Sequence, residues 1–259
     1  SATLVALNRS KRDLRMNRRP DIGLLGDAGE LLSELAALMG GGEGWPKWRE
    51  QLRERDSERE AAIDALAAAR TDYVNPLRLL REMNRALADD SISVADGGDF
   101  VGTASYTLRP RGPLSWMDPG VFGTLGVGAG FALGAKLARP DSEVWAVYGD
   151  GAFGFSLIEF DTFVRHGVPV IAVVGNDGGW AQIAREQVKI LQDDVGTVLA
   201  RTDYHRAAEG LGAAGLLLDA PEKTGQVLQE AREIAAAGRP VLVNALIGST
   251  DFREGSISM

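Results

Sequence analysis

The sequence has 259 residues, 45% hydrophobic and 25% charged, with a formal net charge of -8. This composition is that of a soluble globular protein, and no apolar run reaches the roughly 20 residues of a membrane-spanning helix. The acidic balance argues against a nucleic-acid surface. The lack of cysteine excludes disulfides and thiolate metal sites and fits a cytoplasmic protein, and two histidines are too few for a histidine-based zinc site. The sequence does not open on a basic-then-apolar leader.

The first 72 residues predict a small α/β unit followed by a linker. Residues 3–8 and 21–27 are short apolar runs typical of strands, and residues 28–38 have the apolar spacing of a helix. We interpret residues 1–40 as the end of a smaller α/β central domain, too small to bury a core alone. Residues 41–72 change to glycine and then to charge, which predicts a linker with a charged helix.

From Tyr73 onward, apolar strands alternate with amphipathic helices. This alternation predicts a doubly wound parallel sheet with helices on both faces, formed by residues 73–259. The expected helices are 75–87, 127–138, 156–167, 203–213 and 221–238, and the expected strands are 91–96, 143–150, 169–177, 215–219 and 240–248.

Acidic and amide side chains follow three of these strands. Asp96, Asp150 and the pair Asn176–Asp177 each come just after a strand, in segments rich in glycine. Ligands of such sheets bind at the carboxyl ends of the strands, and glycine allows the backbone to approach a ligand closely. The alternative is a set of ordinary turns. We expect these loops to meet at one edge of the sheet.

Asp150 lies between Gly149 and Gly151, ahead of a helix. Backbone amides at such a position suit a phosphate, but a carboxylate there would repel one. A divalent cation between them removes the conflict, and Asn176 and Asp177 can supply further oxygen ligands. Magnesium prefers oxygen ligands and commonly bridges two phosphates. The residues therefore predict a diphosphate held through magnesium, the alternative being that both aspartates are helix caps or turn residues.

Other phosphate or nucleophile motifs are missing from the sequence. Residues 126–134 are glycine-rich, but no frame matches G-x-G-x-x-G and the segment follows a loop rather than a strand, which disfavours a dinucleotide oxidoreductase. Neither the phosphate loop G-x-x-x-x-G-K-[ST] nor the nucleophile elbow G-x-S-x-G occurs.

The G-D-G of residues 149–151, the following 24 residues (152 through 175) and then Asn-Asp resemble the thiamine-diphosphate motif. Residues 123–144, GTLGVGAGFALGAKLARPDSEV, resemble another segment of the same superfamily. The whole chain resembles its carboxyl-terminal half, in the acetolactate-synthase-like branch that includes a 2-hydroxyacyl-CoA lyase. The resemblance implies the thiamine-diphosphate-binding fold, with thiamine diphosphate and Mg²⁺ as cofactors.

The resemblance also assigns roles to single residues. Asp150 and Asp177 would bind the metal through their side chains, and Gly179 through its carbonyl. Gly151 and Ala152 would donate backbone amides to the diphosphate. Asp177 replaces the second Asn of the common pattern and so adds a negative charge that magnesium tolerates.

The remaining cofactor contacts follow from the same comparison. Gly123 and Leu125 would hold the aminopyrimidine, with Leu125 as the apolar wedge that bends the cofactor. Asp99 and Phe100 lie where related synthases carry Gln-His on the diphosphate, a departure that removes two donors. The set of expected cofactor-binding residues is completed by Gly98, Gly149 and Asn176. Trp180 and Gln182 would be lid or substrate contacts.

The resemblance further implies partners. In this family the catalytic glutamate belongs to an amino-terminal pyrimidine-binding domain, which this chain does not contain, so we assign no catalytic residue here. We expect that half as a separate chain or a missing segment, in a homodimeric or tetrameric assembly. Asn8 and Asp27 match central-domain positions that often meet FAD, ADP or coenzyme A.

Three functions stay open at this point. The first is the cofactor-binding half of a thiamine-diphosphate- and Mg²⁺-dependent carbon–carbon lyase or carboligase, acting on 2-hydroxyacyl-CoA or 2-oxo acid substrates. The second is an acetolactate-synthase-type carboligase acting on pyruvate. The third is a non-catalytic subunit that keeps the cofactor-binding fold.

Overall fold

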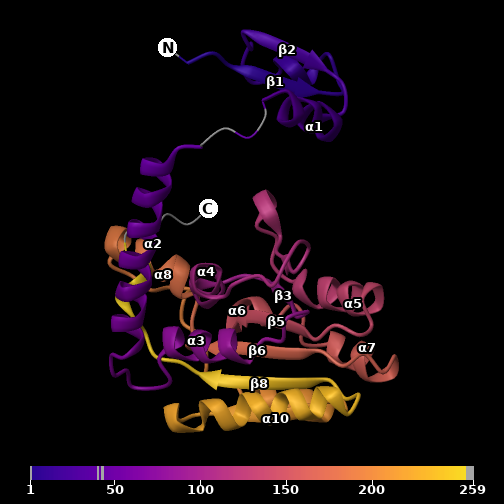
Figure 1. Ribbon diagram of the computed structural model, residues 1–259. Coiled ribbons are helices and arrows are strands. Elements are labelled where there is room, and N and C mark those ends of the chain that lie inside the picture. Colours follow the sequence, from indigo (N-terminus) through magenta and orange to yellow (C-terminus); the bar gives the residue numbers. More distant parts are fainter. Residues whose placement is uncertain (1, 40, 42–43, 255–259) are drawn as a thin grey trace. The chain divides into compact units, whose positions relative to one another are not determined.

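Figure 1 shows the computed structural model, which describes residues 2–39, 41 and 44–254. The chain divides into two compact units, residues 1–57 and 58–259. The boundary between them lies inside helix α2 (Pro46–Ala67), which covers most of the segment that the sequence assigned to a linker with a charged helix.

The first unit contains two parallel strands, helix α1 (Ala28–Met39) and the first part of helix α2. Strand β1 (Val5–Asn8) pairs directly with β2 (Ile22–Leu25), and their connection contains a one-turn 3₁₀ helix at Asp13–Arg15. Helix α1 follows β2. No described residue of this unit is buried.

The second unit is built on a six-stranded sheet in which every pairing is parallel, in the order β4-β3-β5-β6-β8-β7. This confirms the predicted parallel α/β sheet. The strands are β3 (Ile92–Ala95), β4 (Trp116–Met117), β5 (Val144–Gly149), β6 (Ile171–Asn176), β7 (Ala214–Leu218) and β8 (Val241–Leu246). The two-residue strand β4 was not expected, because so short a run has no periodicity.

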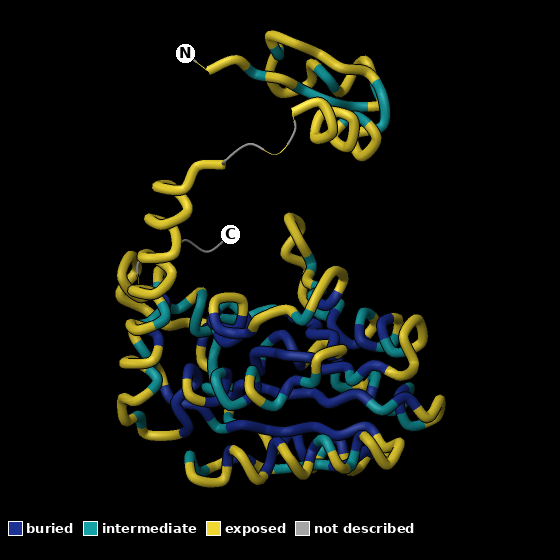
Figure 2. Tube along the Cα trace, viewed as in Figure 1, coloured by how far each residue is buried: buried dark blue, intermediate teal, exposed yellow. Residues whose placement is uncertain are grey.

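Helices cover both faces of this sheet. One core cluster lies beneath α3 (Pro76–Ala86), α4 (Asp99–Thr107) and α10 (Thr224–Ala236), and the other beneath α5 (Gly128–Ala138), α7 (Glu159–Arg165) and α9 (Tyr204–Gly210). The remaining helices are α6 (Asp150–Phe153) and α8 (Ala181–Leu191), with 3₁₀ turns at Gly120–Phe122, Pro221–Lys223 and Asp251–Arg253. Figure 2 shows the buried residues concentrated along the strands between these layers.

Helix α3 shows how local sequence sets an element boundary. Asn75 precedes the helix, and its Oδ1 accepts hydrogen bonds from Leu77 N at 2.9 Å and Arg78 N at 3.2 Å. Pro76 occupies the first helical position, where its missing N–H costs nothing. Asn75 and Pro76 together therefore set the residue at which α3 begins.

The strand order creates a crevice beside β3. From β3 the chain passes outward to β4 and then returns past β3 to β5, so the connections diverge between β3 and β5. In open parallel sheets, the carboxyl edge at such a point is where ligands bind. Among the described residues, no helix is long and apolar enough to cross a membrane.

Candidate functional site

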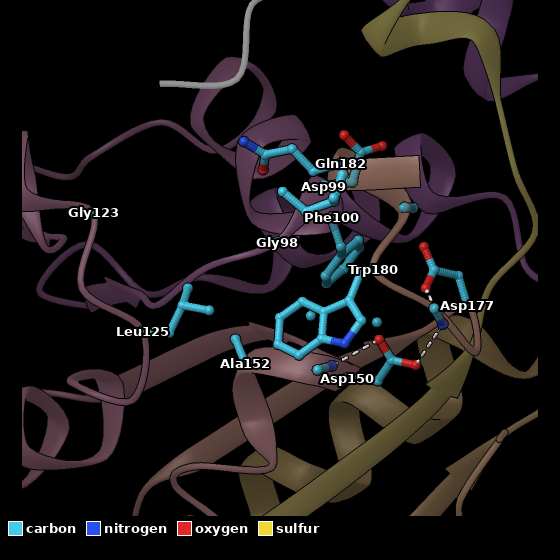
Figure 3. Close-up of a pocket in the computed structure, with 16 residues that line it drawn as sticks. Gly98, Asp99, Phe100, Gly123, Leu125, Asp150, Ala152, Asp177, Trp180 and Gln182 are labelled. Carbon is cyan, nitrogen blue, oxygen red and sulfur yellow. Dashed lines mark hydrogen bonds between the residues drawn. The ribbon is translucent and has the colours of Figure 1, made fainter. Parts of the chain in front are cut away.

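A cavity of about 300 Å³ opens at the carboxyl ends of β3, β5 and β6 (Figure 3). The structure brings nearly all of the expected site residues to its wall: Gly98, Asp99, Phe100, Gly123, Leu125, Gly149, Asp150, Gly151, Ala152, Asp177, Gly179, Trp180 and Gln182. Three further lining residues were not anticipated, namely Gly175, Ala181 and Ile183. Asn176 is the expected residue that does not line the cavity.

Asp150 lies at the junction of β5 and α6 and is 1% exposed. Its Oδ1 accepts a hydrogen bond from Gly151 N at 2.8 Å, and its Oδ2 accepts from Gly178 N at 2.9 Å and Gly179 N at 3.2 Å. Burial raises the pKa of Asp150, and the three backbone amides oppose that rise. One carboxylate thus ties the turn after β5 to the turn after β6.

Asp177 follows β6 on the neighbouring strand. Burial, and then the negative charges of Asp150 and Asp99, raise the pKa of Asp177 to about 7. Its Oδ1 accepts a hydrogen bond from Gly179 N at 3.2 Å. Two carboxylates that repel each other in a partly buried site are stabilised by a cation placed between them.

The donor set fits magnesium. Among the residues that the structure describes, no group of three or more His, Cys, Asp or Glu side chains could hold a metal ion. A cation beside Asp150 and Asp177 would therefore have at most these two carboxylates from the side chains and would need further oxygen ligands. Magnesium is commonly held by one or two carboxylates together with water and substrate phosphates, so the oxygen donors present suit it.

Asn176 points into the core beneath the site. Its Nδ2 donates to Thr202 O at 3.0 Å and to Asn244 Oδ1 at 3.1 Å, and the residue is fully buried. Its Oδ1 has no hydrogen-bond partner among the described residues. These contacts anchor the end of β6 to β8, so Asn176 holds the strand that carries Asp177.

Two glycines are needed for close packing around the cavity. A Cβ at position 175 would lie 2.4 Å from the Phe100 ring, and a Cβ at position 97 would lie 2.1 Å from Leu125 Cδ2. Any other residue at either position would displace a large side chain of the cavity wall. Phe100 and Leu125 can therefore occupy these places only because positions 175 and 97 carry no side chain.

Asp96, the first acidic residue after β3, anchors the loop that carries Leu125. Its Oδ1 accepts from Gly126 N at 2.9 Å and its Oδ2 accepts from Gly128 N at 2.7 Å. Burial raises the pKa of Asp96, while these two amides oppose the rise. Asp96 therefore shapes the wall rather than facing the cavity.

Trp180 lies within the cavity (Figure 3), where its ring covers Gly151: a Cβ at position 151 would meet the indole at 2.8 Å. Trp180 N donates to Thr197 O at 2.8 Å, which ties the start of α8 to a later loop. The ring is thus part of the wall beside the amide of Gly151.

Arg201 is a site-supporting residue that the sequence analysis missed. It donates to the carbonyls of Asn176 and Ile247, the latter at 3.1 Å, and its guanidinium lies 4.0 Å from the centre of the Tyr73 ring. It also opposes the raised pKa of Asp177. No local spacing links these positions, so only the folded chain reveals them.

In the first unit, Asn8 and Asp27 make local contacts. Asn8 Oδ1 accepts from Ser10 N at 2.8 Å, and Asp27 Oδ1 accepts from Glu30 N at 3.0 Å at the start of α1. Asp27 also forms an ion pair with Arg9. Both side chains therefore shape turns after the strands.

Comparison with known proteins gives one family and a consistent set of relatives. The family described as "Thiamine pyrophosphate enzyme, C-terminal TPP binding domain" matches residues 96–245. The human and bovine proteins named 2-hydroxyacyl-CoA lyase 2 are each 51% identical over 266 residues, covering 100% of this chain and 42% of the relative. A probable acetolactate synthase of Mycobacterium bovis is 37% identical over 226 residues, covering 84% of this chain and 40% of the relative. The chain thus spans less than half the length of these relatives.

Proposed function

The chain belongs to the thiamine pyrophosphate (thiamine diphosphate) enzymes, whose C-terminal cofactor-binding domain it carries, and we propose that it is the cofactor-binding half of a carbon–carbon lyase or carboligase. The observation that carries the proposal is the pair of carboxylates formed by the buried Asp150 and the partly buried Asp177, which follow adjacent strands and line one cavity. Similarity over the whole chain to proteins named 2-hydroxyacyl-CoA lyase 2 supports a 2-hydroxyacyl-CoA substrate.

Different residues of the cavity would bind the metal and the diphosphate of the cofactor. Asp150, Asp177 and the Gly179 carbonyl would bind Mg²⁺, and the metal would neutralise the diphosphate. The amides of Gly151 and Ala152 would donate to phosphate oxygens, and Gly151 N would do so in place of its hydrogen bond to Asp150 Oδ1. When bound, thiamine diphosphate supplies the nucleophilic carbon that cleaves or forms a bond next to a carbonyl group.

Leu125 would press against the cofactor from the β3 side, since Gly97 and the Asp96-bound loop hold it there. Trp180 and Gln182 would exclude water from the reacting face. Exclusion of water protects reactive intermediates and strengthens the electrostatic contacts of the site. The cavity residues therefore bind, orient and shield, and the proton-transferring glutamate would come from a pyrimidine-binding amino-terminal half.

An exposed apolar loop supports a partner beside the cavity. Val121 and Phe122, next to the cavity residue Gly123, are 98% and 89% exposed, and Phe155 and Ile158 between α6 and α7 are also exposed. Large apolar side chains that stay exposed are typical of interaction surfaces. We assign them to contact with pyrimidine-binding domains in a dimer or tetramer. Residues 1–40 would belong to a central domain, with a nucleotide-type ligand such as FAD, ADP or coenzyme A as its occupant.

The first test is metal-dependent cofactor binding. Asp150→Asn keeps the shape of the side chain but removes its charge, so the affinity for Mg²⁺–thiamine diphosphate should fall by about 100-fold or more, because the diphosphate charge is left unbridged. Asp150→Ala should abolish binding. Calorimetric titration of the chain reconstituted with an amino-terminal half measures both effects.

Asp161→Asn is the matched control, since it removes the same charge from an exposed position on α7. Equal affinity for Asp150→Asn and Asp161→Asn would contradict the metal assignment. Turnover of 2-hydroxyacyl-CoA by the reconstituted protein supports the lyase, turnover of pyruvate alone supports an acetolactate-synthase-type carboligase, and cofactor binding without any turnover supports a non-catalytic subunit.

A further inference from the structure

Asp99 lines the cavity, yet its carboxylate is engaged elsewhere. Figure 3 shows the carboxylate pointing away from Asp150. It forms an ion pair with Arg185 of helix α8, and its Oδ1 lies 3.7 Å from Nε of Arg253 in the turn at Asp251–Arg253. One side chain at the start of α4 therefore joins two segments that are distant in the sequence.

These charges are shielded from solvent. The side chains of Asp99, Arg185 and Arg253 are 20%, 16% and 11% exposed. The same two segments are also bridged by Lys189 and Glu254, whose atoms lie 3.5 Å apart but whose side chains are more than 60% exposed. Exposed pairs contribute little because water and salt screen them, whereas shielded ones are screened much less. The Asp99 contacts are therefore the stronger connection.

Gly102 provides an independent sign that the turn is built to lie on α4. A Cβ at this position would lie 2.9 Å from one terminal nitrogen of Arg253 and 3.0 Å from its Cζ. The guanidinium thus packs against bare helix backbone that any side chain would cover. Beside it, Phe252 meets the ring of Tyr106 edge-on, with centroids 5.8 Å apart.

The joined segments border the cofactor cavity. Gln182 and Ile183 of α8 line it, and Gln182 and Arg253 both line a neighbouring cavity of about 540 Å³ that shares Leu125 with the first. Any outward movement of α8 or of the 251–253 turn would therefore widen the access to both cavities.

We propose that Asp99 is a positioning residue that clasps α8 and the 251–253 turn against α4, and that this clasp, rather than contact with the diphosphate, is its role. The negative charge of the Asp99 carboxylate is balanced by the guanidinium groups of Arg185 and Arg253, so a contact with the diphosphate is not needed to explain its position. The clasp limits how often the cavity opens. The part that concerns the cofactor rests on the proposed function.

The first experiment measures opening without any ligand. In Asp99→Asn, backbone amides of residues 183–191 should exchange with deuterium about ten-fold faster than in the unaltered chain, because α8 loses its shielded ion pair. Arg185→Lys keeps the charge and should stay close to the unaltered chain. Lys189→Gln removes the exposed pair between the same segments and should leave exchange unchanged. Equal exchange in Asp99→Asn and the unaltered chain would overturn the proposal.

The second experiment separates the two arms of the clasp. Gly102→Ala places a methyl group where the Arg253 guanidinium lies, so residues 251–254 should lose protection while α8 keeps it. The matched control is Gly134→Ala in α5, where the added Cβ meets nothing within 4 Å. Both changes favour a helix by propensity, so neither endangers the fold. Identical protection of 251–254 in the two variants would show that Arg253 is not clasped.

The third experiment tells a clasp from a ligand. In Asp99→Asn, Mg²⁺–thiamine diphosphate should associate and dissociate faster by similar factors, leaving its equilibrium affinity within about three-fold, since easier opening changes both rates alike. A change of affinity carried by dissociation alone would instead make Asp99 a diphosphate contact. If the unaltered protein binds no thiamine diphosphate, the proposed function fails, while the exchange experiments still decide on the clasp.

Discussion

Strands β2 and β6 are both apolar and parallel, yet every residue of β2 is exposed and every residue of β6 is buried. Each also contains a glycine, Gly23 in β2 and Gly175 in β6. The difference arises from their neighbours: β6 has a strand on either side and helices on both faces, whereas β2 has β1 as its one paired strand. Apolar composition predicts a strand, but the layers above and below decide whether it is in a core.

The largest expected difference is between the two units as separate polypeptides. Residues 58–259 should unfold in a cooperative thermal transition, whereas residues 1–57 should show none, because no described residue of the first unit is buried. Circular dichroism melts of the two polypeptides measure this. A sigmoidal melt of residues 1–57 would remove the contrast.

One glycine in each strand tests this difference in packing, because a change to alanine adds a single Cβ. Gly175→Ala should lower the free energy of unfolding by about 3 kcal/mol, because the methyl group meets the Phe100 ring in a packed core. Gly23→Ala, whose Cβ would have its nearest neighbours at 3.8 Å, should change it by less than about 0.5 kcal/mol. Urea denaturation gives both values. Similar losses at the two positions would show that the packing of β6 is not special.

A carboxyl group that is largely shielded from water in the second unit, Asp177, should make the stability of that unit depend on pH. The folded pKa of Asp177, about 7, lies above the value near 3.9 of an unfolded chain, so its ionisation costs stability as pH rises between the two. Without metal, Asp177→Asn should therefore raise the free energy of unfolding by about 2 kcal/mol at pH 8 and have a much smaller effect at pH 4.

The measurement is urea denaturation in the presence of a chelator at both pH values. Glu34→Gln on the exposed helix α1 removes a charge from the first unit and should show no such pH dependence. An Asp177→Asn effect that is the same at both pH values would mean that the site does not penalise the ionised carboxyl.

The smallest change in the free energy of unfolding is expected from the loss of an exposed ion pair. Both units have such pairs. Asp161 and Arg165 on α7 pair at 2.7 Å with both side chains about half exposed. Asp161→Asn should cost less than about 0.5 kcal/mol, because solvent screens the pair. Asp27→Asn in the first unit keeps a side-chain oxygen that can accept from Glu30 N, so it removes only the ion pair with Arg9 and should have a similarly small effect.

Much of the sheet could be predicted because its signals are local. The strands that became β5 and β6 are continuous apolar runs, and Asp150 and Asp177 follow them directly. Parallel strands place their carboxyl ends at one edge, so the meeting of these residues in one cavity required only the correct fold class. Helix α4 and strand β4 were not anticipated, since one begins in a glycine-rich segment and the other has two residues.

The sequence by itself therefore determined the fold class, the family resemblance and the set of polar residues at the strand ends. Only the tertiary structure decided which of them face the cavity. The side chain of Asn176 points into the core, where it donates hydrogen bonds to Asn244 and Thr202. The carboxylate of Asp99 points toward Arg185 and Arg253. These partners lie many residues away, and no periodicity relates them. Burial and charge pairing select the direction of each side chain, and both exist only once the layers have packed.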